Sequence, residues 1–458
     1  MEPDIIKIIE KLKNRAADFG GKETDYIFRN NTKLDSITGS KGNYFGWINP
    51  EEPPNGAYED LSLVVFPAYE KGKPWIVALG VGSAGFKNDI QLASKPGTRR
   101  LFSKIVGENG FIKSDFTDLK TKLTKLTKDD NLAHLKATLE RYSNVLPAAR
   151  IVEDPDSDEG FSILEGFLAA YARIRQWPST KNQIKLVDSI LSRFESSNVE
   201  DDVLIKNLLR ERKYIVLQGA PGTGKTYSAK TIANEENYKT FFTQFHAETT
   251  YSDFIYGIRP SLNSDMIKYE EHIGVFNNAV KWAEEHPEES TLLIIDEINR
   301  ANLSSVLGPI FYLFEYQAGE RNLELELYPG KTITELPHNF YVIATMNTAD
   351  RSLAVVDFAL RRRFAWYTLK PKKLDIINFH KSDFDRISNI FTEYANHHEL
   401  NLQPGQAYFI ANEEQMKDRI KYELYPLIRE YIEEGLLIDA REEFNTYFLE
   451  RINTPLFE

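Results

Sequence analysis

The pattern of apolar residues changes near residue 213. From there, short runs rich in β-branched and aromatic residues recur, and segments with helical spacing separate them. The clearest runs are KYIVLQG, YKTFFTQF, TLLIIDE and FYVIATMN, at residues 213–219, 238–245, 291–297 and 340–347. Apolar runs that are buried on both faces and alternate with helices are typical of a parallel sheet. The pattern therefore predicts a doubly wound α/β domain.

The region before this domain mixes helical patterns with short strands. LSLVVFPAY and PWIVALGVG, at residues 61–69 and 74–82, are rich in strand-forming residues, and the EKGK between them predicts a hairpin turn. The acidic segment VEDPDSDEG, residues 152–160, predicts a loop or hinge. Residues 184–212 have a helical pattern that leads into the next domain.

Residues after about 370 are mostly helical in pattern, and the clearest amphipathic stretch is EEQMKDRIKYELYPLIREYIEEGLL, residues 413–437. A chain of 458 residues should hold about three domains, at roughly 150 residues each. We therefore predict an N-terminal α+β domain over 1–185, an α/β domain over 186–370 and a C-terminal helical lid over 371–458.

The composition of the chain excludes several kinds of site and of protein. The chain has no cysteine, which excludes a disulfide framework and any thiolate nucleophile or metal ligand. Its N-terminal segment alternates charged and apolar residues, unlike a signal peptide. No apolar run approaches the roughly 20 residues that span a bilayer. We therefore expect a cytoplasmic protein without a membrane partner.

The segment GAPGTGKT, residues 219–226, lies between a predicted strand and a predicted helix and matches G-x-x-x-x-G-K-[ST]. Glycines let the backbone N–H groups of such a loop face phosphate oxygens, and the following helix presents its positive end to the same charge. We expect Lys225 to reach the β- and γ-phosphates of a nucleotide and the Thr226 hydroxyl to bind Mg²⁺. The predicted nucleotide-binding residues are Gly219, Ala220, Pro221, Gly222, Thr223, Gly224, Lys225, Thr226, Tyr227 and Asp296.

Two further predicted strands end in polar residues. Asp296 and Glu297 end the run TLLIIDE, and Asn347 ends FYVIATMN. In an open α/β sheet, ligands lie at the carboxyl ends of the strands. We therefore expect Asp296 to hold Mg²⁺ partly through water, Glu297 to polarise the attacking water, and Asn347 to orient that water. The glutamate beside the metal ligand favours hydrolysis over simple nucleotide storage.

The stretch MNTADRSLAVVDFALRRRF, residues 346–364, contains four arginines. Guanidinium groups this close repel one another unless anionic groups lie among them. One interpretation is that the cluster meets the phosphates of a nucleotide. The other is a solvated basic helix end that is paired with Asp350 and Asp357.

The blocks GAPGTGKT, IIDEINRAN, TMNTADRSL and DFALRRRF, in this order and spacing, resemble an AAA+ P-loop NTPase module. More narrowly they resemble the McrB family, the nucleotide-driven subunits of modification-dependent restriction systems. The segment QFHAETTYSDFIYGIRP, residues 244–260, also resembles that family. The resemblance implies that Thr226 and Asp296 serve Mg²⁺, and that Glu297 activates water while Asn347 acts as the sensor.

The resemblance also implies an oligomer. One or more of Arg351, Arg362 and Arg363 would act on the nucleotide of a neighbouring subunit in a homo-oligomeric ring, for which a hexamer is expected. A trans arginine accelerates hydrolysis by roughly 10³- to 10⁵-fold because it neutralises charge in the transition state. The expected cofactors are GTP or ATP with Mg²⁺. GTP rests on the resemblance alone, and ATP remains open.

The function implied by the resemblance is an NTP hydrolase motor that recognises double-stranded DNA, modified or foreign, and drives a separate McrC-like nuclease in anti-phage defence. No nuclease constellation is visible in the sequence, so a partner chain would carry the cutting site. Two alternatives remain open: a nucleotide-dependent assembly scaffold, and a MoxR-like protein-remodelling ATPase.

Residues 81–150 carry thirteen Lys or Arg against seven Asp or Glu, in a chain whose net charge is −12. This basic stretch predicts either a solvated helix face or a surface that contacts phosphates. The aromatic residues nearby belong either to a core or to a surface on which bases stack. The candidates for such contacts are Arg99, Arg100, Trp75, Phe86 and Phe102.

Overall fold

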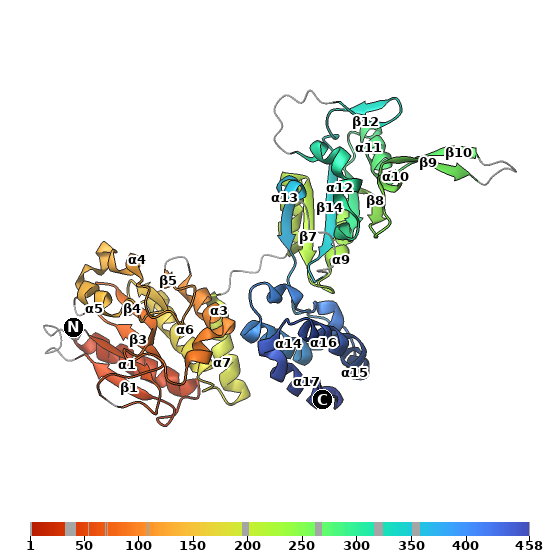
Figure 1. Cartoon of the computed structure of the whole chain (residues 1–458). Coiled ribbons are helices and arrows are strands. Elements are labelled where there is room, and N and C mark those ends of the chain that lie inside the picture. Colours follow the sequence, from red (N-terminus) through yellow and green to blue (C-terminus); the bar gives the residue numbers. More distant parts are fainter. Residues whose placement is uncertain are drawn as a thin grey trace. The chain divides into compact units, whose positions relative to one another are not determined.

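The computed structural model describes residues 2–32, 43–53, 55–68, 70, 72–107, 110–194, 201–261, 268–315, 324–349 and 358–457. Contacts within the chain divide it into two compact units, Met1–Ser197 (unit 1) and Asn198–Glu458 (unit 2), whose elements are labelled in Figure 1. The division of the sequence into three domains stays a prediction.

Unit 1 contains a six-stranded sheet with the order β1-β2-β3-β4-β6-β5. Every neighbouring pair is antiparallel. The predicted hairpin is confirmed, because β3 pairs with β4 from Leu61 opposite Val81 to Phe66 opposite Ile76. The strands are β1 (Ile27–Asn31), β2 (Tyr44–Ile48), β3 (Leu61–Phe66), β4 (Trp75–Val81), β5 (Gly110–Ile112) and β6 (Ala148–Val152).

Helices cover both faces of this sheet. One core contains α1, α3, α6 and α7, and a second core on the opposite face contains α4 and α5. Trp75 and Phe102 are buried in the first core, and Phe86 packs against it while partly buried. The helices are α1 (Glu2–Asp18), α2 (Ile90–Ser94), α3 (Pro96–Val106), α4 (Thr124–Thr127), α5 (Lys136–Tyr142), α6 (Asp158–Ile174) and α7 (Lys181–Leu191).

Two basic residues in the stretch 81–150 donate hydrogen bonds to backbone carbonyls within unit 1. Arg99 Nε donates a hydrogen bond to the carbonyl of Lys113 at 3.1 Å. Lys113 is buried, and its Nζ donates to the carbonyl of Asn144 at 2.6 Å. Cations bound in this way satisfy carbonyl groups of the same unit. Lys113 is therefore buried and not part of a solvated helix face, and for the rest of the basic stretch the choice between the two interpretations stays open.

Unit 2 contains a five-stranded sheet with the order β15-β7-β14-β11-β8, and every pair in it is parallel. The four predicted strands are confirmed. The prediction of burial on both faces is wrong for β8, which lies at the edge of the sheet and leaves Phe242 44% exposed. The strands are β7 (Tyr214–Gly219), β8 (Lys239–Gln244), β11 (Thr291–Asp296), β14 (Phe340–Asn347) and β15 (Ala365–Thr368).

Helices again cover both faces. Ile215, Leu217 and Ile343 pack toward α8 and α9, whereas Val216, Leu293 and Val342 pack toward α11 and α12. Two antiparallel pairs, β9 with β10 and β12 with β13, form separate small sheets (Figure 1). These elements are α8 (Asp201–Arg212), α9 (Lys225–Glu235), α10 (Tyr251–Phe254), β9 (Tyr256–Ser261), β10 (Lys268–Ile273), α11 (Val275–Glu285), α12 (Leu303–Val306), β12 (Leu325–Tyr328), β13 (Lys331–Ile333) and α13 (Phe358–Arg363).

The C-terminal part of unit 2 is helical, as predicted, and has its own core. The predicted amphipathic helix runs through α15, a π-helical turn at Ile420–Leu424, and α16. The helices are α14 (Lys381–Tyr394), α15 (Glu413–Arg419), α16 (Tyr425–Glu433) and α17 (Arg441–Ile452). Across the described residues, no helix has the length and apolar character needed to span a membrane.

Candidate nucleotide-binding site

The loop GAPGTGKT connects the end of β7 to the start of α9, as the sequence predicts. Gly222 and Gly224 have φ angles of +78° and +86°, which a residue with a Cβ adopts only with strain. Gly224 is also the residue that precedes the first turn of α9. The loop therefore turns at two glycines and leads directly into the N-terminus of α9, whose positive end suits an anion.

Lys225 is buried at the first position of α9 and folds back over the loop. Its Nζ donates hydrogen bonds to the carbonyls of Gly219 at 3.0 Å and Ala220 at 2.9 Å. These two carbonyls hold the ammonium group inside the loop, at the centre of the predicted phosphate site.

Three side chains meet where β11 and β14 end beside the loop. Thr226 Oγ1 donates to Asp296 Oδ1 at 2.6 Å, and Thr345 Oγ1 donates to the same oxygen at 2.7 Å. Asp296 is 8% exposed. The two predicted Mg²⁺ ligands thus lie in contact, on different elements, and a third residue fixes the orientation of the carboxylate.

Glu297 follows directly and has an unusual backbone conformation. Its φ angle is +55°, a region that costs a residue other than glycine about 1 to 3 kcal/mol and is common at functional sites. Its backbone N–H donates to Thr345 Oγ1 at 3.0 Å, and its Oε1 accepts from Asn347 Nδ2 at 2.5 Å. The side chain of Glu297 is therefore fixed against the tip of β14.

Asn347 lies opposite Gly219 in the register of β14 and β7. The next residue, Thr348, donates its N–H to the carbonyl of Gly219 at 3.1 Å. Asn299 Nδ2 donates to the carbonyl of Asn347 at 3.3 Å. The tips of three neighbouring strands therefore bring the predicted loop, acidic pair and sensor together, and their catalytic roles stay predictions.

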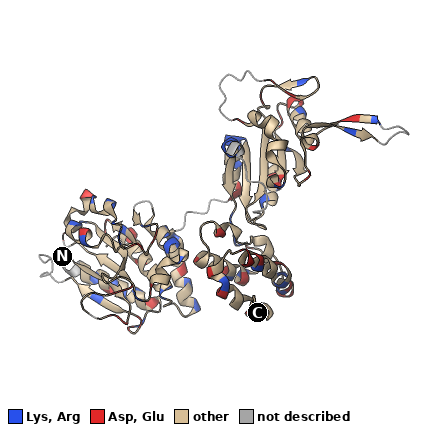
Figure 2. Ribbon diagram, in the orientation of Figure 1, with Lys and Arg blue, Asp and Glu red and all other residues tan. Residues whose placement is uncertain are grey.

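The arginines that follow β14 differ in exposure. The side chain of Arg362 is 70% exposed, whereas that of Arg363 is 10% exposed. Both form ion pairs with Glu315, at 3.4 Å for Arg362 and closer for Arg363. The guanidinium of Arg363 also lies over the ring of Phe311, 5.7 Å from its centroid. Figure 2 shows the arginines at the basic end of α13. The predicted residues Arg351, Asp350 and Asp357 lie outside the described residues.

The helical lid contacts the phosphate-binding loop mainly through backbone atoms. Gly405 donates its N–H to the carbonyl of Pro221 at 2.9 Å, and Ala407 donates to that of Gly222 at 3.0 Å. Gln406 is buried between them, and its Nε2 donates to the carbonyl of Thr223 at 2.7 Å. A Cβ on Gly405 would come within 2.1 Å of the backbone of Gly222, so only glycine fits at this contact.

Sequence reasoning missed three residues of this site. Thr345 was part of a predicted strand, but no pattern marks a hydroxyl that joins Asp296 to the N–H of Glu297. Gln406 and Arg419 belong to the lid, and Arg419 Nη1 donates to the carbonyl of Ala407 at 2.6 Å. The sequence gives no signal for them because their partners are backbone carbonyls of distant or irregular segments.

The residues present fit a magnesium ion. Mg²⁺ prefers oxygen ligands and is usually held by one or two protein side chains, with water and phosphate completing its coordination. Thr226 and Asp296 offer a hydroxyl and a carboxylate 2.6 Å apart, and both are oxygen donors. Among the described residues, no cluster of three or more His, Asp or Glu could hold a metal by itself.

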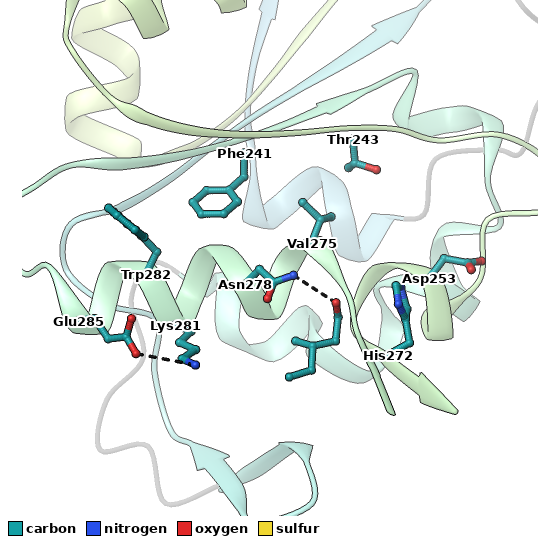
Figure 3. A pocket seen from close by; sticks show the side chains of 10 residues that line it. Phe241, Thr243, Asp253, His272, Val275, Asn278, Lys281, Trp282 and Glu285 are labelled. Carbon is teal, nitrogen blue, oxygen red and sulfur yellow. Dashed lines mark hydrogen bonds and ion pairs between the residues drawn. The ribbon is translucent and has the colours of Figure 1, made fainter. Parts of the chain in front are cut away.

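A separate hollow of about 600 Å³ lies beside the edge strand β8, between the base of the β9–β10 hairpin and α11 (Figure 3). Phe241 and Trp282 line it, together with Lys281 and Glu285, whose charged groups lie 3.9 Å apart. It contains none of the predicted site residues.

Comparisons with known proteins agree with this geometry. Residues 214–364 match the AAA domain (dynein-related subfamily). The chain is 38% identical over 209 residues to the type IV methyl-directed restriction enzyme EcoKMcrB subunit of Escherichia coli. This alignment covers 42% of this chain and 45% of that protein. It is 28% identical over 208 residues to the type II restriction enzyme BsuMI component YdiS of Bacillus subtilis. This alignment covers 37% of this chain and 60% of that protein.

Among solved structures, a RuvB mutant of Thermotoga maritima is 17% identical, with a TM-score of 0.23, over 41% of this chain and 48% of that chain. A likeness this low carries no argument. The chain spans about half the length of the curated relatives it matches. The parallel sheet, the phosphate-binding loop and the helical lid are those of an AAA+ P-loop NTPase. The chain therefore contains an AAA domain over residues 214–364, and this part of it is McrB-like.

Proposed function

We propose that unit 2 hydrolyses a nucleoside triphosphate, with GTP as the favoured nucleotide and ATP as the alternative. The observation that carries the proposal is the 2.5 Å hydrogen bond from Asn347 Nδ2 to Glu297 Oε1. It fixes a carboxylate one residue beyond Asp296, which contacts the threonine of the loop. A carboxylate held in this place suits a group that polarises water at the γ-phosphate.

The other residues bind and position the phosphates. Lys225 exchanges its two carbonyl partners for the β- and γ-phosphates, and the N-terminus of α9 faces the same charge. Thr226 and Asp296 would hold Mg²⁺, which supplies positive charge beside the phosphate oxygens. Glu297 accepts the hydrogen bond of the attacking water, and Asn347 keeps the carboxylate in place.

A neighbouring copy of the chain completes the site. Of the two predicted arginines that the structure describes, Arg362 suits this role better, because its side chain is 70% exposed and lies 3.4 Å from Glu315, whereas Arg363 is 10% exposed and pairs with Glu315 more closely. We therefore propose a homo-oligomeric ring, with a hexamer expected, in which Arg362 meets the nucleotide bound by the adjoining subunit. Arg351, which the sequence analysis also predicts for this role, is a second candidate for the arginine that acts on the neighbouring subunit.

The biological role is proposed from the relatives. Their names describe a type IV methyl-directed restriction enzyme subunit and a type II restriction enzyme component. We infer that the chain acts in restriction of foreign or modified DNA as part of anti-phage defence. In this proposal, unit 1 recognises double-stranded DNA, and a separate McrC-like nuclease cuts it when unit 2 turns over nucleotide.

Steady-state hydrolysis of GTP and of ATP, each measured over a range of protein concentrations, tests the proposal. Specific activity should rise with concentration, because each site then gains an arginine from a neighbour. The Glu297→Gln variant should bind nucleotide but lose turnover, since an amide is a poor acceptor for the proton of water. Flat specific activity would contradict the shared site, and unchanged turnover of the variant would favour the assembly scaffold.

A further inference from the structure

The lid segment that contacts the phosphate-binding loop determines which way the peptide groups of that loop face. Residues 405–407 of the lid donate hydrogen bonds to the three consecutive carbonyls of residues 221–223. In a trans peptide unit the C=O and N–H groups point in opposite directions. Carbonyls that face the lid therefore turn the N–H groups of Gly222, Thr223 and Gly224 toward the inside of the loop, where a phosphate would lie.

His380 connects this segment to the rest of the lid through its backbone. Its N–H donates to the carbonyl of Phe409 at 2.8 Å, and Phe409 ends the helical turn Gln406–Phe409, which carries two of the loop contacts. Close by, Ala411 donates its N–H to the carbonyl of Asn378 at 2.7 Å. The C-terminal side of the turn is therefore fixed to the residues that precede α14.

The imidazole ring of His380 lies between two carboxylates. Its Nδ1 is 2.6 Å from Asp383 Oδ2, in the first turn of α14, and its Nε2 is 2.5 Å from Oε2 of Glu413, the first residue of α15. The Ser382 hydroxyl lies farther from Nδ1, at 3.2 Å. A neutral imidazole has one N–H group, so a lone pair of the other nitrogen would face a carboxylate, whereas the imidazolium donates from both nitrogens.

Arg451 of α17 shares both carboxylates with His380. Its Nε lies 2.9 Å from Asp383 Oδ1, and its Nη2 lies 3.0 Å from Glu413 Oε1. Asp383 is buried and also accepts a hydrogen bond from the Tyr447 hydroxyl at 3.0 Å. Two carboxylates thus face a single permanent positive charge. A proton on His380 balances the charges, and an unbalanced charge in a partly buried cluster is unfavourable.

Other charged residues of these helices pair with one another. Lys381, next to His380 in α14, lies 3.2 Å from Asp375. Arg386 of α14 pairs with Glu450 of α17. The turn that contacts the loop, with the sequence QAYF, carries no charged side chain. The two carboxylates and the arginine described above are therefore the charges that the His380 ring meets.

The partners of His380 keep their charge states near neutral pH. The hydrogen bond with His380, followed by that with Arg451, lowers the pKa of the Glu413 carboxyl. Burial and the nearby charge of Asp383 raise the pKa of the Tyr447 phenol, which therefore keeps the proton that it donates. Histidine is the side chain whose charge ordinarily changes between about pH 5 and 8. The imidazole is therefore the group through which a change of pH acts on this cluster.

We propose that His380 is a positioning residue of the nucleotide site: its imidazolium joins α14 to α15, holds the lid segment on the phosphate-binding loop and so strengthens nucleotide binding. Loss of the proton removes one of its two donors, which loosens the lid segment and with it the orientation of the loop. Affinity is therefore highest at acid pH and falls as the pH rises through the titration of the histidine. This inference rests on the proposed nucleotide binding by unit 2.

Binding of GDP and of ADP with Mg²⁺ to the full chain, from about pH 5.5 to about pH 8.5, tests the inference. Neither probe has a γ-phosphate, so hydrolysis does not interfere. The phosphates of the probes also titrate, so each affinity is compared with that of His380→Gln, whose amide does not change charge with pH. If half of one hydrogen bond to a charged group affects binding, the wild type should bind roughly 3- to 12-fold more tightly than His380→Gln at the acid end. The two should bind about equally at the alkaline end.

Two variants serve as controls. His398→Gln removes an exposed histidine of the same lid, whose ring packs only beside that of His397 among the described contacts, and should keep the pH dependence of the wild type. His380→Lys carries its positive charge over the whole range and should bind within about threefold of the wild type at acid pH, without the loss at alkaline pH. It keeps the test decisive if His380→Gln does not fold, which circular dichroism establishes.

Hydrogen exchange in the nucleotide-free chain separates this inference from the proposed function. At acid pH the N–H groups of Gly405 and Ala407 should be better protected in the wild type than in His380→Gln, and this difference should vanish at alkaline pH. Both chains are compared at the same pH, so the intrinsic exchange rates cancel. Equal protection at acid pH, or a pH dependence of affinity that His380→Gln retains, overturns the inference. If neither probe binds while exchange follows the expected pattern, the proposed function alone is overturned.

Discussion

Replacing Thr345 with valine removes one hydroxyl from the centre of the site while keeping nearly the same shape. That hydroxyl accepts from the N–H of Glu297 at 3.0 Å and donates to Asp296 Oδ1 at 2.7 Å. Without it, the backbone of Glu297, already at a φ of +55°, loses a hydrogen bond, and the Asp296 carboxylate loses one of its two hydroxyl donors. The variant therefore removes one hydrogen bond that holds the side chain of Asp296 and one that holds the backbone of Glu297.

The expected magnitude follows from these two bonds. A hydrogen bond to a charged group contributes about 1.5 to 3 kcal/mol and a neutral one about 0.5 to 1.5 kcal/mol. The Thr345→Val variant should therefore lose roughly 2 to 4 kcal/mol of interaction. If half of this loss affects the transition state, kcat falls roughly 5- to 30-fold. The KM should change little, because the loop and Lys225 still bind the phosphates.

A matched control lies at the other end of β11. Thr291 is fully buried, and its hydroxyl has no hydrogen-bond partner in the part of the chain that the structure describes. Thr291→Val should therefore keep kcat and leave the free energy of unfolding unchanged or slightly raised. Both variants are compared by steady-state NTP hydrolysis and by urea unfolding. A Thr345→Val enzyme with wild-type kcat, or an equal loss in both variants, would refute the proposed coupling.

Two arginines of unit 2 and a buried aspartate of unit 1 give three further predictions. Arg362→Ala should lower NTP turnover roughly 10³-fold or more with an unchanged melting temperature, which assays with mixed subunits check. Arg363→Ala should cost up to about 1 kcal/mol of stability, because Glu315 loses the less exposed of its two arginine partners, and thermal unfolding checks this. Although burial acts to raise the pKa of Asp60, hydrogen bonds from three backbone N–H groups lower it overall. Its contribution to stability is therefore present above the ordinary carboxyl pKa of 3.8 and is lost as the pH falls through the lowered pKa of the folded state. Asp60→Asn should flatten the dependence of urea unfolding on pH below about pH 4.

Much of unit 2 was predictable because its strands are apolar runs that end in polar residues. In a parallel sheet such ends lie at one edge, so Asp296 and Asn347 were expected to meet, and their side chains do lie together around Glu297 and Thr345. Burial of β8 was predicted wrongly, because strand order determines which run lies at the edge and the sequence does not give that order. The apolar content of KTFFTQ is compatible with either position.

Other features depend on contacts that have no local pattern. Arg362 and Arg363 are neighbours in sequence and both pair with Glu315, yet Arg362 is 70% exposed while Arg363 is 10% exposed and lies over the ring of Phe311. The acidic segment before α6 was expected to be a loop or hinge, and Ser157 in it accepts from the N–H of Gly160 and so begins a helix inside unit 1. Such outcomes require the tertiary structure.

The contact between the lid and the phosphate-binding loop has a consequence for tolerance to mutation. Two of its hydrogen bonds join main-chain N–H groups of Gly405 and Ala407 to main-chain carbonyls, so most substitutions at position 407 leave them intact. A one-residue deletion just before Gly405 would shift every donor along the chain and break the set together. Over evolutionary time we expect position 407 to vary, while Gly405, Gln406 and the length of the segment stay the same.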